Sequence, residues 1–168
     1  MRNLVFIDSP WWRLTGLLLI SWLVMTQLHE WGHIAAGLCS GGTLVDFDVW
    51  PWHLPYSFFE PDPYPLITLW AGPLLGIAIP LLAAAIIRRP SAWFISHFCW
   101  IANGSYLALA WISGDRYLDT PKLLEHGAST WTITLYCLVT ISIGYSGLKR
   151  SIQSILKIKA SPESIPKI

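Results

Sequence analysis

Charged side chains are scarce in this sequence. Lysine, arginine, aspartate and glutamate make up 12% of the 168 residues, whereas hydrophobic residues make up 54% and the mean hydropathy is +0.49. Such a composition is typical of an integral membrane protein. The formal net charge of +1 also argues against the strongly basic surface of a nucleic-acid-binding protein, so no nucleic-acid partner is expected.

Cysteine is rare as well. Cys39, Cys99 and Cys137 lie in or beside apolar runs and show no C-x-x-C spacing, which argues against a disulfide framework and a cysteine metal site. We interpret the three as packing residues. There is no internal repeat and no low-complexity segment, so we expect one membrane-embedded domain over residues 1–150, followed by a basic C-terminal tail over residues 151–168.

Long apolar runs dominate the rest of the chain. A helix needs roughly 20 residues to cross a hydrocarbon core about 30 Å thick. Four runs are long enough, at about residues 14–38, 64–87, 91–113 and 130–148. We therefore expect an all-α polytopic membrane protein with about four transmembrane helices. Only Arg88, Arg89 and Pro90 separate the second run from the third, which predicts a tight helical hairpin there.

Three segments lie between or after these runs. Residues 39–63 are rich in proline, glycine and aromatics and alternate in polarity over residues 43–50, which predicts an interfacial loop that can contain a β-hairpin. The segment "GDRYLDTPKLLEHGAS" is a strongly polar loop between the third and fourth runs. After Lys149 we expect a short basic amphipathic helix that Pro162 and Pro166 bring to an end.

The basic residues predict an orientation in the membrane. Two of the eleven, Arg116 and Lys122, fall in the polar loop, and the other nine fall on the opposite side of the membrane. Cytoplasmic loops carry the excess of lysine and arginine, so both termini are predicted to be cytoplasmic. The protein is expected to be multi-pass, in a bacterial inner membrane or another cellular membrane. Its oligomeric state stays open.

Polar residues interrupt the first apolar run in "MTQLHEWGHIAAGL". His29, Glu30 and His33 form the pattern H-E-x-x-H. Residues four apart lie on the same face of a helix, so both imidazoles can bind one metal ion, with Glu30 beside it as a general base. Titratable groups inside a membrane are costly and are seldom kept without a role. We therefore predict a Zn²⁺ site here, as in zinc hydrolases, about 22 Å along the helix from Leu14.

A catalytic zinc ion usually takes three protein ligands, and H-E-x-x-H supplies two. Several polar residues fall on the same side of the membrane, and position alone does not select among them. The candidates are Asp46, Asp48, His53, Glu60, Asp62, Asp115, Asp119, Glu125 and His126.

Three motifs together resemble those of the site-2 protease family of intramembrane zinc metalloproteases. They are "HEWGH" in the first long apolar run, "AGPLLG" in the next and "YLDTPKLL" after the third. The resemblance covers roughly residues 29–124. It implies zinc held by His29, His33 and Asp119, with Glu30 as the general base. Asp115 is the alternative third ligand.

The resemblance also implies residues that surround the metal. Gly72 and Pro73 match a turn that lies by the active site in the family, and Asn103 resembles an asparagine that often precedes the aspartate motif. Two positions depart from the family pattern: Gly76 stands where G-P-x-x-N has asparagine, and Thr120 stands where L-D-G has glycine. The departures are typical of a divergent branch, and the sequence contains no segment long enough for the PDZ domain of larger relatives.

The expected function is that of a metalloendopeptidase that performs intramembrane proteolysis. It would hydrolyse a peptide bond in or near the transmembrane segment of a membrane-anchored protein. The alternative is a non-catalytic membrane protein of the same fold that binds a metal or a partner, as a pseudoprotease, a scaffold or a transporter-like protein. The altered "AGPLLG" and "LDT" motifs favour that alternative.

Overall fold

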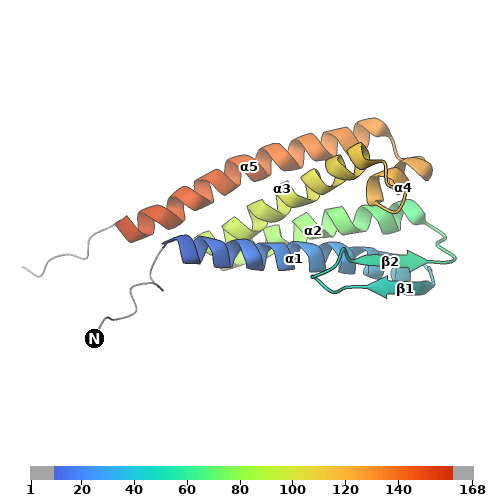
Figure 1. Cartoon of the computed structure of the whole chain (residues 1–168), viewed down its shortest axis with the longest axis horizontal. Coiled ribbons are helices and arrows are strands. Elements are labelled where there is room, and N and C mark those ends of the chain that lie inside the picture. The colour runs from blue at the N-terminus through green and yellow to red at the C-terminus, as the bar shows by residue number, and fades with distance from the viewer. Residues whose placement is uncertain (1–9, 161–168) are drawn as a thin grey trace, which may run out of the picture.

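Most of the chain is helical. The computed structural model describes residues 10–160, which contain five α-helices and one two-stranded sheet (Figure 1). In chain order the elements are α1 (Pro10–Cys39), β1 (Leu44–Asp48), β2 (Tyr56–Phe59), α2 (Pro65–Ile87), α3 (Pro90–Ser113), α4 (Asp119–Glu125) and α5 (Thr130–Ala160).

Four long helices lie side by side, and α3 contacts the other three (Figure 1). Helices α1, α2 and α3 pack against one another, and α5 packs mainly along α3. The hairpin of β1 and β2 lies at the same end of the bundle as α4, and the turn between α2 and α3 lies at the opposite end. Residues distant in sequence therefore meet at the end that holds the hairpin and α4.

Proline and left-handed residues set the limits of the middle helices. Pro65 and Pro90 occupy the first turns of α2 and α3, where a missing N–H is tolerated. Arg88 ends α2 with φ 56° and Gly114 ends α3 with φ 66°. The tight turn between α2 and α3 is thereby confirmed, close to the expected limits.

Two of the described helices are long and apolar enough to cross a membrane. They are α2 and the Thr130–Leu156 part of α5. Helix α1 has the length, but Arg13, His29 and Glu30 lower its mean hydropathy. The expected crossings by α1 and α3 stay a prediction.

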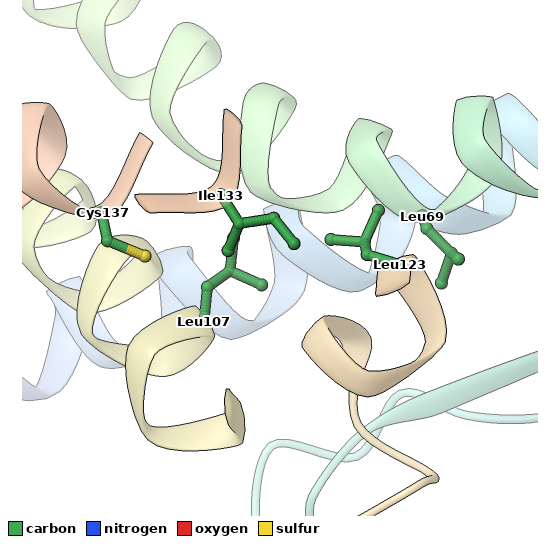
Figure 2. Packing of buried hydrophobic residues seen from close by; sticks show 5 residues of the cluster. All are labelled: Leu69, Leu107, Leu123, Ile133 and Cys137. Atoms are coloured by element: carbon green, nitrogen blue, oxygen red, sulfur yellow. The ribbon is translucent and has the colours of Figure 1, made fainter. Parts of the chain in front are cut away.

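A hydrophobic cluster fixes the short helix α4 against the bundle. Leu123 of α4 is fully buried and packs with Leu69 of α2, Leu107 of α3, and Ile133 and Cys137 of α5 (Figure 2). The segment between α3 and α5 was expected to be a polar loop, and this prediction was wrong for Asp119–Glu125, which forms the helix α4. Burial of Leu123 is the physical reason, since an apolar side chain in this segment reaches the core shared by three long helices.

The loop after the first apolar run was expected to contain a β-hairpin, and β1 and β2 form one there. Strands β1 and β2 are antiparallel, with Leu44 opposite Phe59, Asp48 opposite Tyr56, and an irregularity between Leu44 and Asp46. The ring of Phe59 fills the space beside Gly37, where a Cβ atom would collide with it. The hairpin thus packs directly on the last turns of α1.

The last helix is longer than expected. It continues from Thr130 to Ala160 without a break near Leu148. The helix expected after Lys149 is therefore present as the last part of α5, and the boundary expected at residue 150 falls inside this helix. Ile155 explains the extension, because it is buried against Leu17 of α1 and Phe94 of α3. The expected effect of Pro162 and Pro166 lies outside the described residues.

Candidate metal centre

Helix α1 presents two imidazoles on one face. His29 and His33 are 7% and 5% exposed, and their ring centroids are 4.8 Å apart with an interplanar angle of 76°. The spacing of four residues places both rings on the same helix face, as H-E-x-x-H predicts, and the rings meet edge to face. The first turn of α4 supplies the third polar group, the carboxylate of Asp119.

The three side chains converge on a point between α1 and α4. Asp119 Oδ2 lies 2.9 Å from His29 Nε2 and 3.2 Å from His33 Nε2, and the two Nε2 atoms are 3.1 Å apart. Of the histidine, cysteine and carboxylate groups in the described chain, these three form a group with the spacing of metal ligands. Asp119, and not Asp115, therefore approaches the imidazoles.

Hydrogen bonds on the far sides of the rings determine where the protons are. His29 Nδ1 lies 2.7 Å from Asn103 Oδ1, and His33 Nδ1 lies 2.8 Å from the Thr68 carbonyl oxygen. The Asn103 amide nitrogen donates to the Cys99 carbonyl oxygen at 2.8 Å, which leaves Oδ1 facing His29. Both partners are acceptors, so each Nδ1 carries the hydrogen and each Nε2 of a neutral imidazole presents a lone pair.

This arrangement requires a cation. Two lone pairs and a carboxylate oxygen within 3.2 Å repel one another unless a proton or a metal ion lies between them. Burial alone would raise the pKa of Asp119, but positive charge at the imidazoles, which a protonated His33 supplies, holds it well below its usual range. The carboxyl is thus an anion, the form that ligates metals. Two histidines and one aspartate are a ligand set that suits a catalytic Zn²⁺.

Glu30 lies beside this group and is not paired. The residue is 5% exposed, and its Oε1 atom has no hydrogen-bond partner within residues 10–160. An unpaired carboxylate oxygen is costly to bury. The position of Glu30 is explained by a cavity of about 340 Å³, which Glu30 lines together with His29, His33 and Asp119.

Several elements enclose the cavity. Its other walls are mostly apolar and come from α1, β2 and the segment before it, α2, α3, and the stretch that includes α4. These walls include Tyr56, Ser57, Phe58, Thr68, Tyr106 and Lys122. A group held in this cavity can therefore lie against the imidazoles and Glu30.

Glycines allow the close packing around the imidazoles. A Cβ atom on Gly72 would collide with the His33 ring, so α2 can pass the ring only at a glycine. On Gly32, a Cβ atom would lie 2.8 Å from the Ala71 carbonyl oxygen, which brings the backbones of α1 and α2 together. At Gly76 it would lie 2.9 Å from the Asn103 amide. The Asn103 side chain thus occupies the space beside position 76.

The remaining candidate residues lie elsewhere. Asp115 is exposed and its Oδ1 accepts a hydrogen bond from the Tyr117 N–H at 3.0 Å, although it lines the outer cavity. The carbonyl oxygen of Pro73 accepts a hydrogen bond from the Tyr136 hydroxyl of α5. Asp48 is bonded to His53 at 2.9 Å, which holds the pKa of its carboxyl below the usual range. None of the other candidate ligands joins the group of His29, His33 and Asp119, namely Asp46, Glu60, Asp62, Glu125 and His126.

Sequence reasoning missed three contributors to the site. The Thr68 carbonyl oxygen orients His33, and no side-chain pattern reports a backbone acceptor. Tyr106 packs edge-on against His29, with ring centroids 5.2 Å apart. Its position three residues after Asn103, on the same helix face, is a signal that could have identified it. Lys122 of α4 lines the cavity wall.

Comparison with known proteins finds no match among family models, curated proteins or solved structures. The functional assignment therefore depends on the geometry of this site and on the motifs that resemble those of site-2 proteases.

Proposed function

We propose that the chain is a zinc-dependent intramembrane endopeptidase of the site-2 protease type. One observation carries the proposal: Nε2 of His29, Nε2 of His33 and Oδ2 of Asp119 meet within 3.2 Å beside the unpaired carboxylate of Glu30, in a cavity. Two imidazoles, one carboxylate and a free general base are the parts that a zinc hydrolase needs.

The proposal places all four long helices in the membrane. Besides α2 and α5, helix α1 exposes Leu19 and Trp22, and α3 exposes Leu109 and Ile112, which is the outward surface that a lipid-facing helix requires. Arg88 and Arg89 lie at the end of the bundle away from the hairpin and α4. With the positive-inside rule, this charge distribution supports cytoplasmic termini and a site that opens toward the opposite face.

The residues of the site have distinct tasks in this chemistry. His29, His33 and Asp119 would hold the ion, and Asn103 and the Thr68 carbonyl oxygen orient the two rings. Bound zinc supplies a Lewis acid that polarises the scissile carbonyl and activates water near neutral pH. Glu30 accepts a proton from the attacking water and passes it to the amide nitrogen as the carbon–nitrogen bond breaks. The products are a carboxylic acid and an amine.

The hairpin supports a peptide substrate in extended form. The sheet has two strands within the described residues, so each strand has one unpaired edge. Tyr56, Ser57 and Phe58 all line the cavity although successive side chains point to opposite faces, which indicates that the edge of β2 faces it. A membrane-anchored protein whose transmembrane helix unwinds locally can add a strand there.

Replacement of Glu30 tests the proposal. In detergent-purified protein carrying one equivalent of zinc by elemental analysis, Glu30→Gln should lower cleavage of a transmembrane peptide by about 10²–10⁴-fold, the usual contribution of a general base. Zinc content should stay unchanged because Glu30 is not a ligand. Glu125→Gln, an exposed change at the end of α4, is the matched control and should cleave normally.

Two results would contradict the endopeptidase proposal. The first is wild-type protein that contains no zinc after purification without chelators. The second is cleavage that persists in Glu30→Gln. Stoichiometric zinc with no cleavage of any membrane-anchored substrate would instead favour the non-catalytic metal-binding alternative.

A further inference from the structure

The phenol of Tyr106 is a polar group in the cavity to which the proposed chemistry assigns no task. Tyr106 projects from α3, and its ring packs edge-on against the His29 ring at 5.2 Å and 86°. The residue lines the cavity together with Glu30 and Asp119. The phenol therefore shares this cavity with a metal ligand and the general base.

This position leaves the hydroxyl hydrogen available to a molecule in the cavity. A tyrosine hydroxyl donates one hydrogen bond and can accept others. The imidazole of His29 offers no acceptor to it, because Nδ1 is hydrogen-bonded to Asn103 Oδ1 and Nε2 lies 2.9 Å from Asp119 Oδ2.

Hydrolysis of a peptide bond creates a need for such a donor. As water attacks, negative charge develops on the former carbonyl oxygen, and a preorganised donor beside that oxygen lowers the barrier. Because the oxygen develops its charge beside the ligands of the ion, the donor must lie next to His29, His33 or Asp119. Tyr106 meets this condition through its contact with the His29 ring.

Three other donors near the cavity are engaged elsewhere. The Lys122 ammonium lies over the Phe58 ring at 4.6 Å, and His53 Nδ1 is hydrogen-bonded to Asp48 at 2.9 Å, so both belong to the hairpin side of the cavity. The amide nitrogen of Asn103 donates to the Cys99 carbonyl oxygen. Tyr106, by contrast, packs directly against a metal-ligand ring.

We propose that Tyr106 donates a hydrogen bond to the scissile carbonyl oxygen as that oxygen becomes negative, which makes it a catalytic residue of the endopeptidase. The inference rests on the proposed function and adds a residue to it. The hydroxyl hydrogen stays on Tyr106 throughout, so the proton balance of the reaction involves only water, Glu30 and the leaving amine. The hydrogen bond from Tyr106 is weaker in the bound substrate, whose carbonyl oxygen is neutral, than in the transition state, where that oxygen becomes negative.

The test uses the zinc-loaded full chain and two variants that each remove one hydroxyl. Tyr106→Phe should keep its zinc and its KM but lose about 10²–10³-fold in kcat, as expected for an oxyanion donor. It should also bind a phosphinic peptide, which mimics the charged tetrahedral state, at least about tenfold more weakly. Tyr136→Phe is the matched control: its hydroxyl bonds the Pro73 carbonyl oxygen outside the cavity, so both quantities should stay unchanged.

The outcomes separate this inference from the function on which it rests. Cleavage by wild-type protein together with unchanged kcat and phosphinate affinity in Tyr106→Phe would overturn the inference and leave the endopeptidase in place. Tyr106-dependent phosphinate binding by a protein that cleaves nothing would support the donor and contradict the endopeptidase. Loss of zinc in Tyr106→Phe would overturn the inference, because the phenol would then act by holding Asp119. Wild-type protein that neither cleaves nor binds the phosphinate would overturn both.

Discussion

Asn103 illustrates how single residues determine the state of the candidate metal centre. Its amide orients the His29 ring by accepting from Nδ1, while its nitrogen is held by the Cys99 carbonyl oxygen. Its side chain also fills the space beside Gly76, where a larger residue would collide with it. Packing therefore explains Gly76, the second glycine in "AGPLLG": α3 contributes the Asn103 amide, and α2 leaves room for it.

Asp119 and Asp115 give a direct test of the ligand set. Asp119→Asn should weaken zinc binding by more than about 100-fold, because loss of even an outer partner of a ligand costs about 10- to 100-fold. Asp115→Asn should leave the affinity unchanged, since that carboxylate is exposed and bonded to the Tyr117 N–H. Competition with a fluorescent zinc chelator measures both affinities. A large loss in Asp115→Asn, with none in Asp119→Asn, would contradict the assignment.

At the scale of elements, α4 is the part that completes the site. It has seven residues, too few for independent stability, and is held by burial of Leu123 and by Thr120. The Thr120 hydroxyl is fully buried and donates to the Leu107 carbonyl oxygen of α3 at 2.7 Å. Threonine in place of the glycine of L-D-G thus fixes the position of Asp119, the residue before it.

Removal of the Thr120 hydroxyl should loosen α4. Thr120→Val keeps the shape of the side chain but leaves the Leu107 carbonyl oxygen unpaired, which should cost about 1–3 kcal/mol of stability and weaken zinc binding. Thr120→Ser should retain most of both. Thr134→Val is the control, because that exposed hydroxyl bonds only within its own helix. Thermal unfolding in detergent and zinc titration measure the effects, and equal behaviour of Thr120→Val and Thr134→Val would contradict them.

At the scale of the whole molecule, the two ends of the bundle differ. The hairpin and α4 lie at one end, and the tight turn between α2 and α3, which holds Arg88 and Arg89, lies at the other (Figure 1). Residues of β2 and of the stretch that includes α4 line the cavity. Cys99 and Cys137 are buried, as expected of packing residues, but Cys39, at the end of α1 beside the hairpin, is exposed, so its expected packing role was wrong. The chain thus carries a natural reporter of the face to which the candidate site opens.

Labelling of Cys39 in intact cells should report the orientation. A membrane-impermeant maleimide should label wild-type protein from outside the cytoplasm, and Cys39→Ser should abolish the signal. Ser91→Cys in the Cys39→Ser background places the thiol at the other end of the bundle, so it should be labelled only after permeabilisation. Labelling of Ser91→Cys, but not of Cys39, in intact cells would reverse the proposed orientation.

Local spacing predicted much of the arrangement, and long-range packing determined the rest. The placement of His29 and His33 on one helix face follows from the helical repeat, and the turn at Arg88 follows from the proline and charges around it. Position in the sequence alone does not distinguish Asp119 from Asp115 as the third ligand. Burial of Thr120 and Leu123 against other helices brings Asp119 to the imidazoles. Ile155 likewise stabilises the extension of α5, because it packs against Leu17 of α1 and Phe94 of α3, which are distant in sequence. The contact of Tyr106 with His29 also depends on how α1 and α3 pack together.

The separation of the ligands along the chain has a further consequence. His29 and Asp119 are 90 residues apart in sequence, and they join the first long helix to the short one that precedes the last. A metal ion bound by both acts as a removable cross-link that closes a long loop, and such a link disfavours the unfolded chain by limiting its conformational freedom. If the proposed function holds, the ion needed for the reaction also stabilises the helical bundle. Removal of the metal would then lower both the activity and the stability of the folded chain.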